Sequence, residues 1–314
     1  MNYRLNLEER LEKEMKRVAH EQIDEATNHL SQVIHHDKLT TKADSVHEAR
    51  KVFKKIRGLL RLFRYAIGKE VYQQENYCFR DAGRLLSSVR DAQVHIETFE
   101  SFSQEISDTV SSELLAQIHH ILIAYQQIIY KQIFETQDNL LASLSFIKQA
   151  QERVEDWLVD EDWSMISQGL KKVYKRGYKD FSQVLEDPTT EKLHEWRKRV
   201  KYLWYHLRIL KPIWPEVMIT LAKQTHELST LLGDDHDLAN LQQLLLNRPD
   251  LVNDKPEINL LFVNLERKRK KLQQSAFLKG QRIYAESPKY FTKRIGCYWQ
   301  AEQRKLMAEP VMQQ

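Results

Sequence analysis

Two short segments of the sequence gather positive side chains in the same order. The first is Val46-His-Glu-Ala-Arg-Lys-Val-Phe-Lys, and the second is Leu193-His-Glu-Trp-Arg-Lys-Arg-Val-Lys. Lys supplies a mobile point charge, and Arg supplies a planar fork of N–H donors that matches phosphate oxygens. The residue types in these segments therefore indicate binding of a phosphate-rich anion.

The spacing of the two segments predicts an internal duplication. Five positions of the first segment, and Arg61 after it, recur 147 residues later: His47, Glu48, Arg50, Lys51, Lys54 and Arg61 map onto His194, Glu195, Arg197, Lys198, Lys201 and Arg208. A second motif recurs at an offset of 146, where Arg90-Asp91 corresponds to His236-Asp237. Two motifs in the same order and at nearly the same spacing divide the chain into halves at 1–155 and 156–314.

Residues 45–65 become two-faced when they are placed on a helix at about 100° per residue. The apolar residues lie on one side, and the cations fall within about 80° of His47 on the other. These cations are Arg50, Lys51, Lys54, Lys55, Arg57 and Arg61. Like charges four residues apart repel by roughly 0.2–0.5 kcal/mol per pair. The alternative is a solvated surface stripe, but such a stripe would mix charges of both signs, whereas here Glu48 is the single acid.

The second half repeats this cationic face and adds further candidates. In the second copy His194, Arg197, Lys198, Lys201 and Arg208 occupy the same angular sector. Lys172 and Arg176 share one side of a helix, and Arg282 lies near the end of another, whereas we expect Arg267–Lys271 to be mainly solvated. Protonated His47 and His194 would add donors. We expect Asp91 and Asp237 to have structural roles.

Composition and periodicity predict an all-α protein. The 314 residues include only 8 Gly and 7 Pro, and apolar residues recur with helical spacing almost everywhere. The helices are expected at 5–36, 45–66, 70–102, 104–136, 139–158, 161–185, 189–211, 215–232, 236–247, 257–286 and 288–307. Ser45-x-x-Glu48 is interpreted as a capping box, and residues 247–256 as a loop. Each half would then hold a bundle of four or five helices.

Several classes of protein are excluded by the sequence. The two cysteines, Cys78 and Cys297, form no C-x-x-C pattern, so neither a disulfide framework nor a zinc site is expected. No apolar run approaches 18 residues, and the N-terminus is charged, so we expect no membrane span, no signal peptide and a cytoplasmic setting. The net charge of +4 conceals strong polarisation, because residues 46–64 hold seven Lys or Arg and one acid.

The sequence argues against metal binding and catalysis and leaves nucleic-acid binding as an alternative. Neighbouring residues of Asp234-Asp-His-Asp237 would point about 100° apart on a helix, so no metal site or other cofactor is expected. No P-loop, nucleophile motif or cluster of metal-binding carboxylates occurs, so we expect a protein that is not an enzyme. Tyr202, Trp204 and Tyr205 could stack on bases, although packing between helices is favoured. Single-stranded RNA therefore remains the alternative ligand.

The chain resembles the CHAD family, which is named for its histidines and its α-helical fold. The resemblance lies in VHEARKVFKKIRGLLRLF (46–63), LLSSVRDAQV (85–94), LHEWRKRVKYL (193–203), LSTLLGDDHDL (228–238) and GQRIYAESPKYF (280–291). It implies two helical bundles related by a pseudo-twofold axis, with basic helices that face a shared cavity or groove. It also implies binding of inorganic polyphosphate, often at polyphosphate granules.

Motif matching to the CHAD family implies a specific set of ligand contacts. These are His47, Arg50, Lys54, Lys55, Arg57, His194, Arg197, Lys198, Lys201 and Arg282, with Arg90 and His236 in the second motif. Lys54 and Lys55 stand where the family often has Arg, which keeps the charge but loses bidentate geometry. The E-x-E-x-K strand motif of the triphosphate-tunnel domain that often accompanies CHAD does not occur, so the helical module is expected alone.

Overall fold

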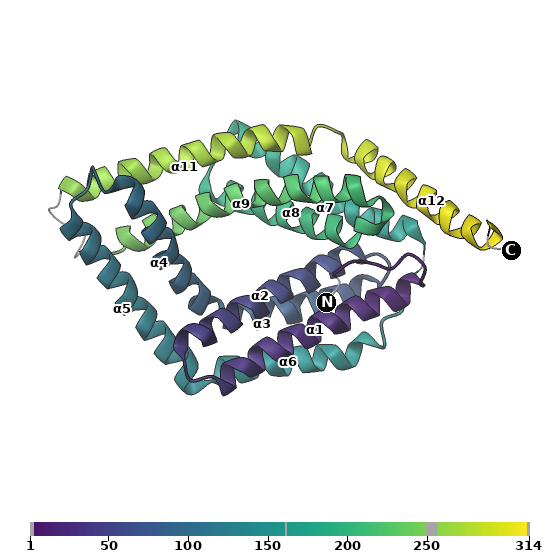
Figure 1. Cartoon of the computed structure of the whole chain (residues 1–314), viewed down its shortest axis with the longest axis horizontal. Helices are drawn as coiled ribbons and strands as arrows, with labels where there is room; N and C mark the ends of the chain where they lie inside the picture. The colour runs from purple at the N-terminus through teal and green to yellow at the C-terminus, as the bar shows by residue number, and fades with distance from the viewer. Residues whose placement is uncertain (1–2, 161, 249–255, 313–314) are drawn as a thin grey trace.

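A computed structural model describes residues 3–160, 162–248 and 256–312, and Figure 1 shows that helices dominate these ranges. The helices are α1 (Leu11–His35), α2 (Leu39–Leu62), α3 (Lys69–Leu85), α4 (Ser87–Ile106), α5 (Ser112–Thr136), α6 (Asp138–Val154), α7 (Trp163–Glu186), α8 (Thr190–Ile209), the 3₁₀ turn η1 (Lys211–Ile213), α9 (Pro215–Leu246), α11 (Pro256–Ile283) and α12 (Pro288–Met312). The predicted all-α fold is confirmed. None of the described helices combines the length and apolar composition needed to cross a bilayer.

The first basic helix starts earlier than the sequence predicts. Helix α2 begins at Leu39, and no side chain caps its N-terminus. Ser45 lies inside the helix and is buried, so the predicted capping box is wrong. Ala43 and Val46 are buried in the core, and this packing extends the helix through a segment whose local signal favoured a start.

The second repeated motif folds differently in the two halves. In the first half, Leu86 has φ −110° and ψ 12° and separates α3 from α4, so the predicted helix over 70–102 is broken. In the second half α9 runs unbroken through Gly233, where the sequence predicted two helices. Gly233 and Leu232 are both buried, so packing holds this glycine within the helix despite its low propensity. Most of the predicted loop over 247–256 lies outside the described residues.

The order of packing partners is repeated along the chain. Helix α1 packs on α2 and α6, as α7 packs on α8 and α12, and α4 packs on α5 as α9 packs on α11. Contacts of α2 with α7 and α8, and of α4 with α9, join the two sets. This order is the one expected of two duplicated halves, and the duplication itself stays a prediction.

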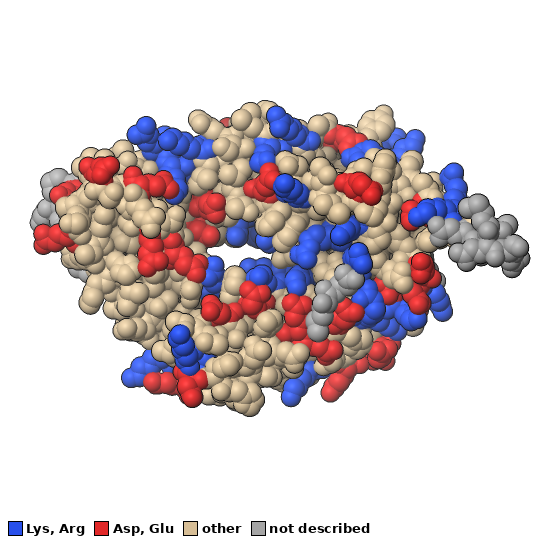
Figure 2. Space-filling view, in the orientation of Figure 1, with Lys and Arg blue, Asp and Glu red and all other residues tan. Residues whose placement is uncertain are grey.

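Two apolar cores hold these helices. The larger core includes Val52 and Ile56 of α2 together with Trp196 of α8, and it also draws on α1, α3, α6, α7 and α12. The smaller core joins α4 and α5 to the end of α9 and the start of α11, at the left of Figure 1. Figure 2 shows an opening through the molecule between α2 on one side and α8 and α9 on the other, with Lys and Arg atoms along its edges.

Helices α2 and α8 meet at Gly58, which corresponds to Tyr205 at the offset of 147. A Cβ atom at Gly58 would lie only 2.8 Å from Tyr205 Cβ and 3.0 Å from the hydroxyl oxygen of Tyr3. The buried His206 ring donates from Nε2 to the carbonyl oxygen of Gly58 at 3.1 Å. Contact between equivalent positions is the isologous contact expected where a local twofold axis passes.

The Gly58→Ala substitution tests this close contact. Alanine favours a helix by about 1 kcal/mol over glycine, but overpacking of a tight interface costs about 1–3 kcal/mol. We expect a net loss of about 1–2 kcal/mol in the free energy of unfolding, measured by denaturant titration.

Gly83→Ala is the matched control, because its Cβ would lie 3.5 Å from Phe53 in ordinary contact. It should leave stability unchanged or raise it by up to about 1 kcal/mol. Equal stability of the Gly58→Ala protein and the unmodified protein would contradict the close approach.

Candidate anion-binding site

The α2–α8 contact brings together four cations from equivalent positions. Lys54 and Arg50 lie one and two turns before Gly58 on the same face of α2, and Lys201 and Arg197 lie one and two turns before Tyr205 on α8. The contact at Gly58 therefore brings the two cations of α2 near the two cations of α8. We call Arg50, Lys54, Arg197 and Lys201 the central cluster.

Lys54 reports the electrostatics of the central cluster. Its side chain is open to solvent, yet it is surrounded by protein atoms. Desolvation is the largest cause that lowers its pKa to about 7, followed by the charges of Arg50, Arg197 and Lys201. The carboxylate of Asp91 acts in the opposite direction and is outweighed. Lys54 and these three cations outnumber the two carboxylates coupled to Lys54, Asp91 and Asp237, so this point carries a net positive charge.

Lys201 repeats this behaviour from the other helix. Desolvation lowers its pKa to about 8, and the charges of Arg197 and Arg208 lower it further. Its Nζ lies 4.4 Å from the ring centroid of Trp204, so the ammonium faces an aromatic surface as well as other cations. Equivalent lysines of the two halves thus have the same perturbation with the same cause.

The two arginines of the central cluster keep hydrogen-bonding capacity. Arg50 donates from Nη1 to the carbonyl oxygen of Ser87 at 3.0 Å, and the same nitrogen lies 3.8 Å from Asp91 Oδ1. The Nε of Arg197 is buried and has no hydrogen-bond partner within the described part of the chain. This guanidinium packs over Gly233, where a Cβ would approach it to 3.4 Å. An unpaired buried donor favours an anionic acceptor.

Asp237 accompanies the cluster from α9, as Asp91 does from α4. Desolvation raises the pKa of Asp237, while Arg197, Arg90 and Lys54 lower it. Both acids of the repeated second motif thus lie beside cations of the first motif. They offset part of the positive charge, and the structural role expected for them stays a prediction.

The histidines lie beside the cluster and are neutral at neutral pH. Burial and the charge of Arg90 lower the pKa of His47 to about 4. Burial lowers the pKa of His194 to about 4 and that of His236 to about 3, and their rings lie 4.1 Å apart. In the ligand-free protein the histidines therefore offer N–H donors and no charge, unlike the protonated donors expected from the sequence.

Four further predicted residues lie at the edge of the cluster, close to its members or to the histidines. Lys51 pairs with Glu48 at 2.8 Å and adds positive charge near Lys201. Arg90 pairs with Glu97 at 3.0 Å, and its charge lowers the pKa values of His47 and Arg50. Lys198 pairs with Glu195, and its charge lowers the pKa of His194. The guanidinium carbon of Arg208 lies 4.9 Å from the centroid of the Trp204 ring.

The remaining predicted residues have their contacts outside the central cluster. Lys55 pairs with Glu25 of α1 at 3.0 Å. Arg57 donates to Asn76 of α3 at 3.3 Å, and Arg61 stacks on Tyr202 at 3.8 Å. The cationic face of α2 is therefore divided between several neighbours.

Three predicted residues lie on other helices. Lys172 of α7 lies 5.7 Å from the centroid of the Tyr65 ring, and the charge of Arg176 lowers the pKa of Asp180. Arg282 is exposed near the end of α11.

One important ion pair was not predicted. Arg269 is buried and donates from Nε to Asp235 Oδ1 at 3.1 Å, and its Nη2 donates to Thr190 at the start of α8. The sequence carried a signal, since Arg269 continues the buried row of Leu261 and Leu265 at helical spacing. This pair ties α9 and α11 to the N-terminal end of the second basic helix.

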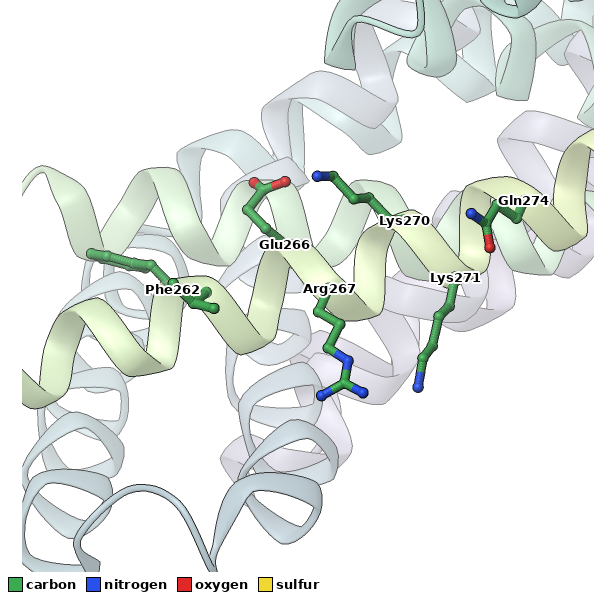
Figure 3. Close-up of a pocket in the computed structure, with 7 residues that line it drawn as sticks. Phe262, Glu266, Arg267, Lys270, Lys271 and Gln274 are labelled. Carbon is green, nitrogen blue, oxygen red and sulfur yellow. The ribbon is translucent and has the colours of Figure 1, made fainter.

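Three other cations of the basic run on α11 face outward, whereas Lys268 pairs with Glu105 of α4. Figure 3 shows Arg267 and Lys271 on one side of α11 and Glu266 and Lys270 on another, around a shallow pocket that includes Phe262. Arg267, Lys270 and Lys271 are exposed, as the sequence predicted for most of this run. They provide a natural comparison for the central cluster.

Replacement of Lys54 by Met should stabilise the ligand-free protein. The folded-state pKa is about 7 against an ordinary 10.5, so the unfavourable charge is fully present below pH 7 and its cost disappears as pH rises toward 10.5. Solvent screens this exposed side chain, so we expect a gain of about 1 kcal/mol below neutral pH, declining at higher pH.

Chemical denaturation across a pH series measures this gain. Lys55→Met is the matched control, because it removes a cation that is paired with Glu25, and it should give no stabilisation. A Lys54→Met protein that is less stable than the unmodified protein at every pH would contradict the repulsion inferred here.

Comparison with known proteins places the fold. A crystal structure of the CHAD domain from the plant Ricinus communis matches with 17% sequence identity and a TM-score of 0.51, covering 96% of this chain and 94% of that chain. Identity at this level shows a common fold alone. Comparison with curated protein sequences gives no match. The family model for the CHAD domain matches residues 24–246, which is more than two thirds of the 314 residues, so the chain belongs to the CHAD domain family.

Proposed function

We propose that this chain binds inorganic polyphosphate without converting it chemically, and that the central cluster is the main contact. The observation that carries the proposal is the meeting of Arg50, Lys54, Arg197 and Lys201 across α2 and α8, with a buried Arg197 Nε that lacks a partner among the described residues. Polyphosphate carries about one negative charge per repeating unit, so a row of cations suffices to hold it.

The proposed mode of binding is electrostatic, with some bidentate contacts. Arg50 and Arg197 would each present N–H donors to phosphate oxygens, and Lys54 and Lys201 would be held in their charged form by the ligand. The neutral His47 and His194 would donate one hydrogen bond each. A chain that binds in this way would also be recruited to polyphosphate granules.

Aromatic contacts favour polyphosphate over single-stranded RNA. Tyr202 and Tyr205 are buried. Trp204 is stacked on His226 at a centroid distance of 4.3 Å, with Lys201 and Arg208 also near its ring. Base stacking needs an accessible ring face. These rings are already occupied by protein contacts, so the site offers charge without a stacking platform.

Charge reversal tests the assignment of the site. We expect Arg50→Glu, Arg197→Glu and Lys201→Glu together to lower affinity for long-chain polyphosphate at least about a hundredfold, because charge-assisted contacts contribute about 1.5–3 kcal/mol each. The measurement is a gel shift across a salt series, with circular dichroism to verify folding.

The matched control reverses three exposed cations of α11, namely Arg267, Lys270 and Lys271, which changes the net charge by the same amount. This control should bind within a few-fold of the unmodified protein. If the folded protein with Arg50→Glu, Arg197→Glu and Lys201→Glu keeps full affinity, the central cluster is not the binding site. Phosphate release from polyphosphate in the presence of Mg²⁺ or Mn²⁺ would contradict a purely binding role.

Competition with RNA separates the two ligand classes. At equal phosphate concentration, single-stranded RNA should displace labelled polyphosphate only weakly, because it gains nothing from its bases at this site. Efficient displacement by RNA would favour the nucleic-acid alternative.

Polyphosphate affinity should also fall as pH rises from about 7 to about 9. Lys54 and Lys201, whose pKa values are about 7 and about 8, lose their charge over this range in the free protein. Bound phosphates raise both values, so binding takes up protons. Calorimetry in two buffers of different ionisation enthalpy measures that uptake, and a pH-independent affinity with no uptake would contradict this mode of binding.

A further inference from the structure

Lys54 lies on α2 one turn before Gly58, where a Cβ atom would come within 2.8 Å of Tyr205 Cβ on α8. At this approach of the two helices the charges of Arg50, Arg197 and Lys201 act on Lys54, and Asp91 of α4 and Asp237 of α9 are the acids coupled to its charge. Arg50 and Arg197 provide guanidinium groups on two different helices. This arrangement combines a nucleophile with docking groups for a small phosphorylated molecule.

Burial and the neighbouring cations lower the pKa of Lys54 to about 7, so a substantial part of its amine is unprotonated near neutral pH. With a pKa of about 7, about three quarters of the side chain is neutral at about pH 7.5, against about one in a thousand for an ordinary lysine. A desolvated lysine next to other cations is a known form of activated amine nucleophile. Lys201 repeats the arrangement with a pKa of about 8, which leaves about a quarter of its amine neutral at that pH.

We propose that Lys54, and to a smaller extent Lys201, is a site of covalent acylation by acyl phosphates such as acetyl phosphate. The phosphoryl group docks on Arg50 and Arg197, and the lysine Nζ attacks the carbonyl carbon. An N–C amide bond forms, the bond between the carbonyl carbon and the phosphate oxygen breaks, inorganic phosphate leaves, and the amine loses one proton to solvent. No oxidant, reductant or metal is needed.

Neighbouring lysines lack this combination of features. Lys51 is paired with Glu48 and Lys55 is paired with Glu25, so each of these amines already holds a carboxylate partner. Lys175 is exposed on α7, away from the repeated motif. Selectivity would therefore follow from position within the central cluster.

Acylation would have a direct consequence for the ligand. It removes the charge of the lysine at the centre of the cluster and adds an amide of larger volume. This consequence rests on the proposed polyphosphate binding, whereas the acylation step needs only the docking of a phosphoryl group.

The experiment treats the full chain with acetyl phosphate at about pH 7.5 and measures acetylation of each lysine by peptide mass spectrometry. We expect Lys54 to be modified at least about tenfold faster than Lys175, with Lys201 between them. Inorganic phosphate in excess should slow the reaction at Lys54 and leave Lys175 unchanged. The paired substitution Arg50→Gln and Arg197→Gln should remove most of the preference.

The uncharged acyl donor p-nitrophenyl acetate has no phosphoryl group for the arginines to bind. With this donor the preference for Lys54 over Lys175 should therefore be smaller than with acetyl phosphate. Modification of Lys54 no faster than Lys175 would overturn the proposal, and an equal preference with both donors would overturn the docking step. Gel shifts with polyphosphate on the same protein are measured separately. Intact polyphosphate binding without selective acetylation therefore sinks this inference alone.

Discussion

Gly58 and Tyr205 lie closer together than two side chains would allow, and this approach sets the distance between α2 and α8. On both helices the rows of cations begin one turn before that contact. Lys54 therefore comes under the charges of Arg197 and Lys201 of the other helix, as the causes of its pKa shift reflect. The buried His206 fixes the same contact through its hydrogen bond to Gly58. Without a glycine here the two helices would separate, and four like charges would no longer share one space.

Holding those charges together opposes folding, and other parts of the structure compensate. The larger apolar core buries Phe53, Ile56 and Trp196 behind the basic faces. The buried Arg269–Asp235 pair joins α9 and α11, and Thr190 joins them to α8. The ligand-free site thus stores electrostatic repulsion that an anion would relieve, because a ligand that binds only the folded state stabilises it. Stability and binding therefore respond in opposite directions to the loss of a central lysine.

Local patterns in the sequence predicted much of this arrangement. The offset of 147 identified the two basic helices, and helical spacing located their cationic faces. The CHAD fold followed from the same motifs. The contacts that select Lys54 and Lys201 over Lys55 could not be predicted, because they depend on which helices pack beside α2. The start of α2 was also predicted wrongly, because burial of Ser45 in the core overrides its capping signal. The break at Leu86 and the unbroken helix at Gly233 likewise depend on tertiary packing.

The most direct test of the account is an experimental structure of the chain with a short, defined polyphosphate. We expect phosphate density between α2 and α8, with oxygens within hydrogen-bonding distance of Arg50 and Arg197 and with the Nε of Arg197 no longer unpaired. Phosphate bound only on the outer face of α11, at Arg267 and Lys271, with the space between α2 and α8 empty of ligand, would contradict it.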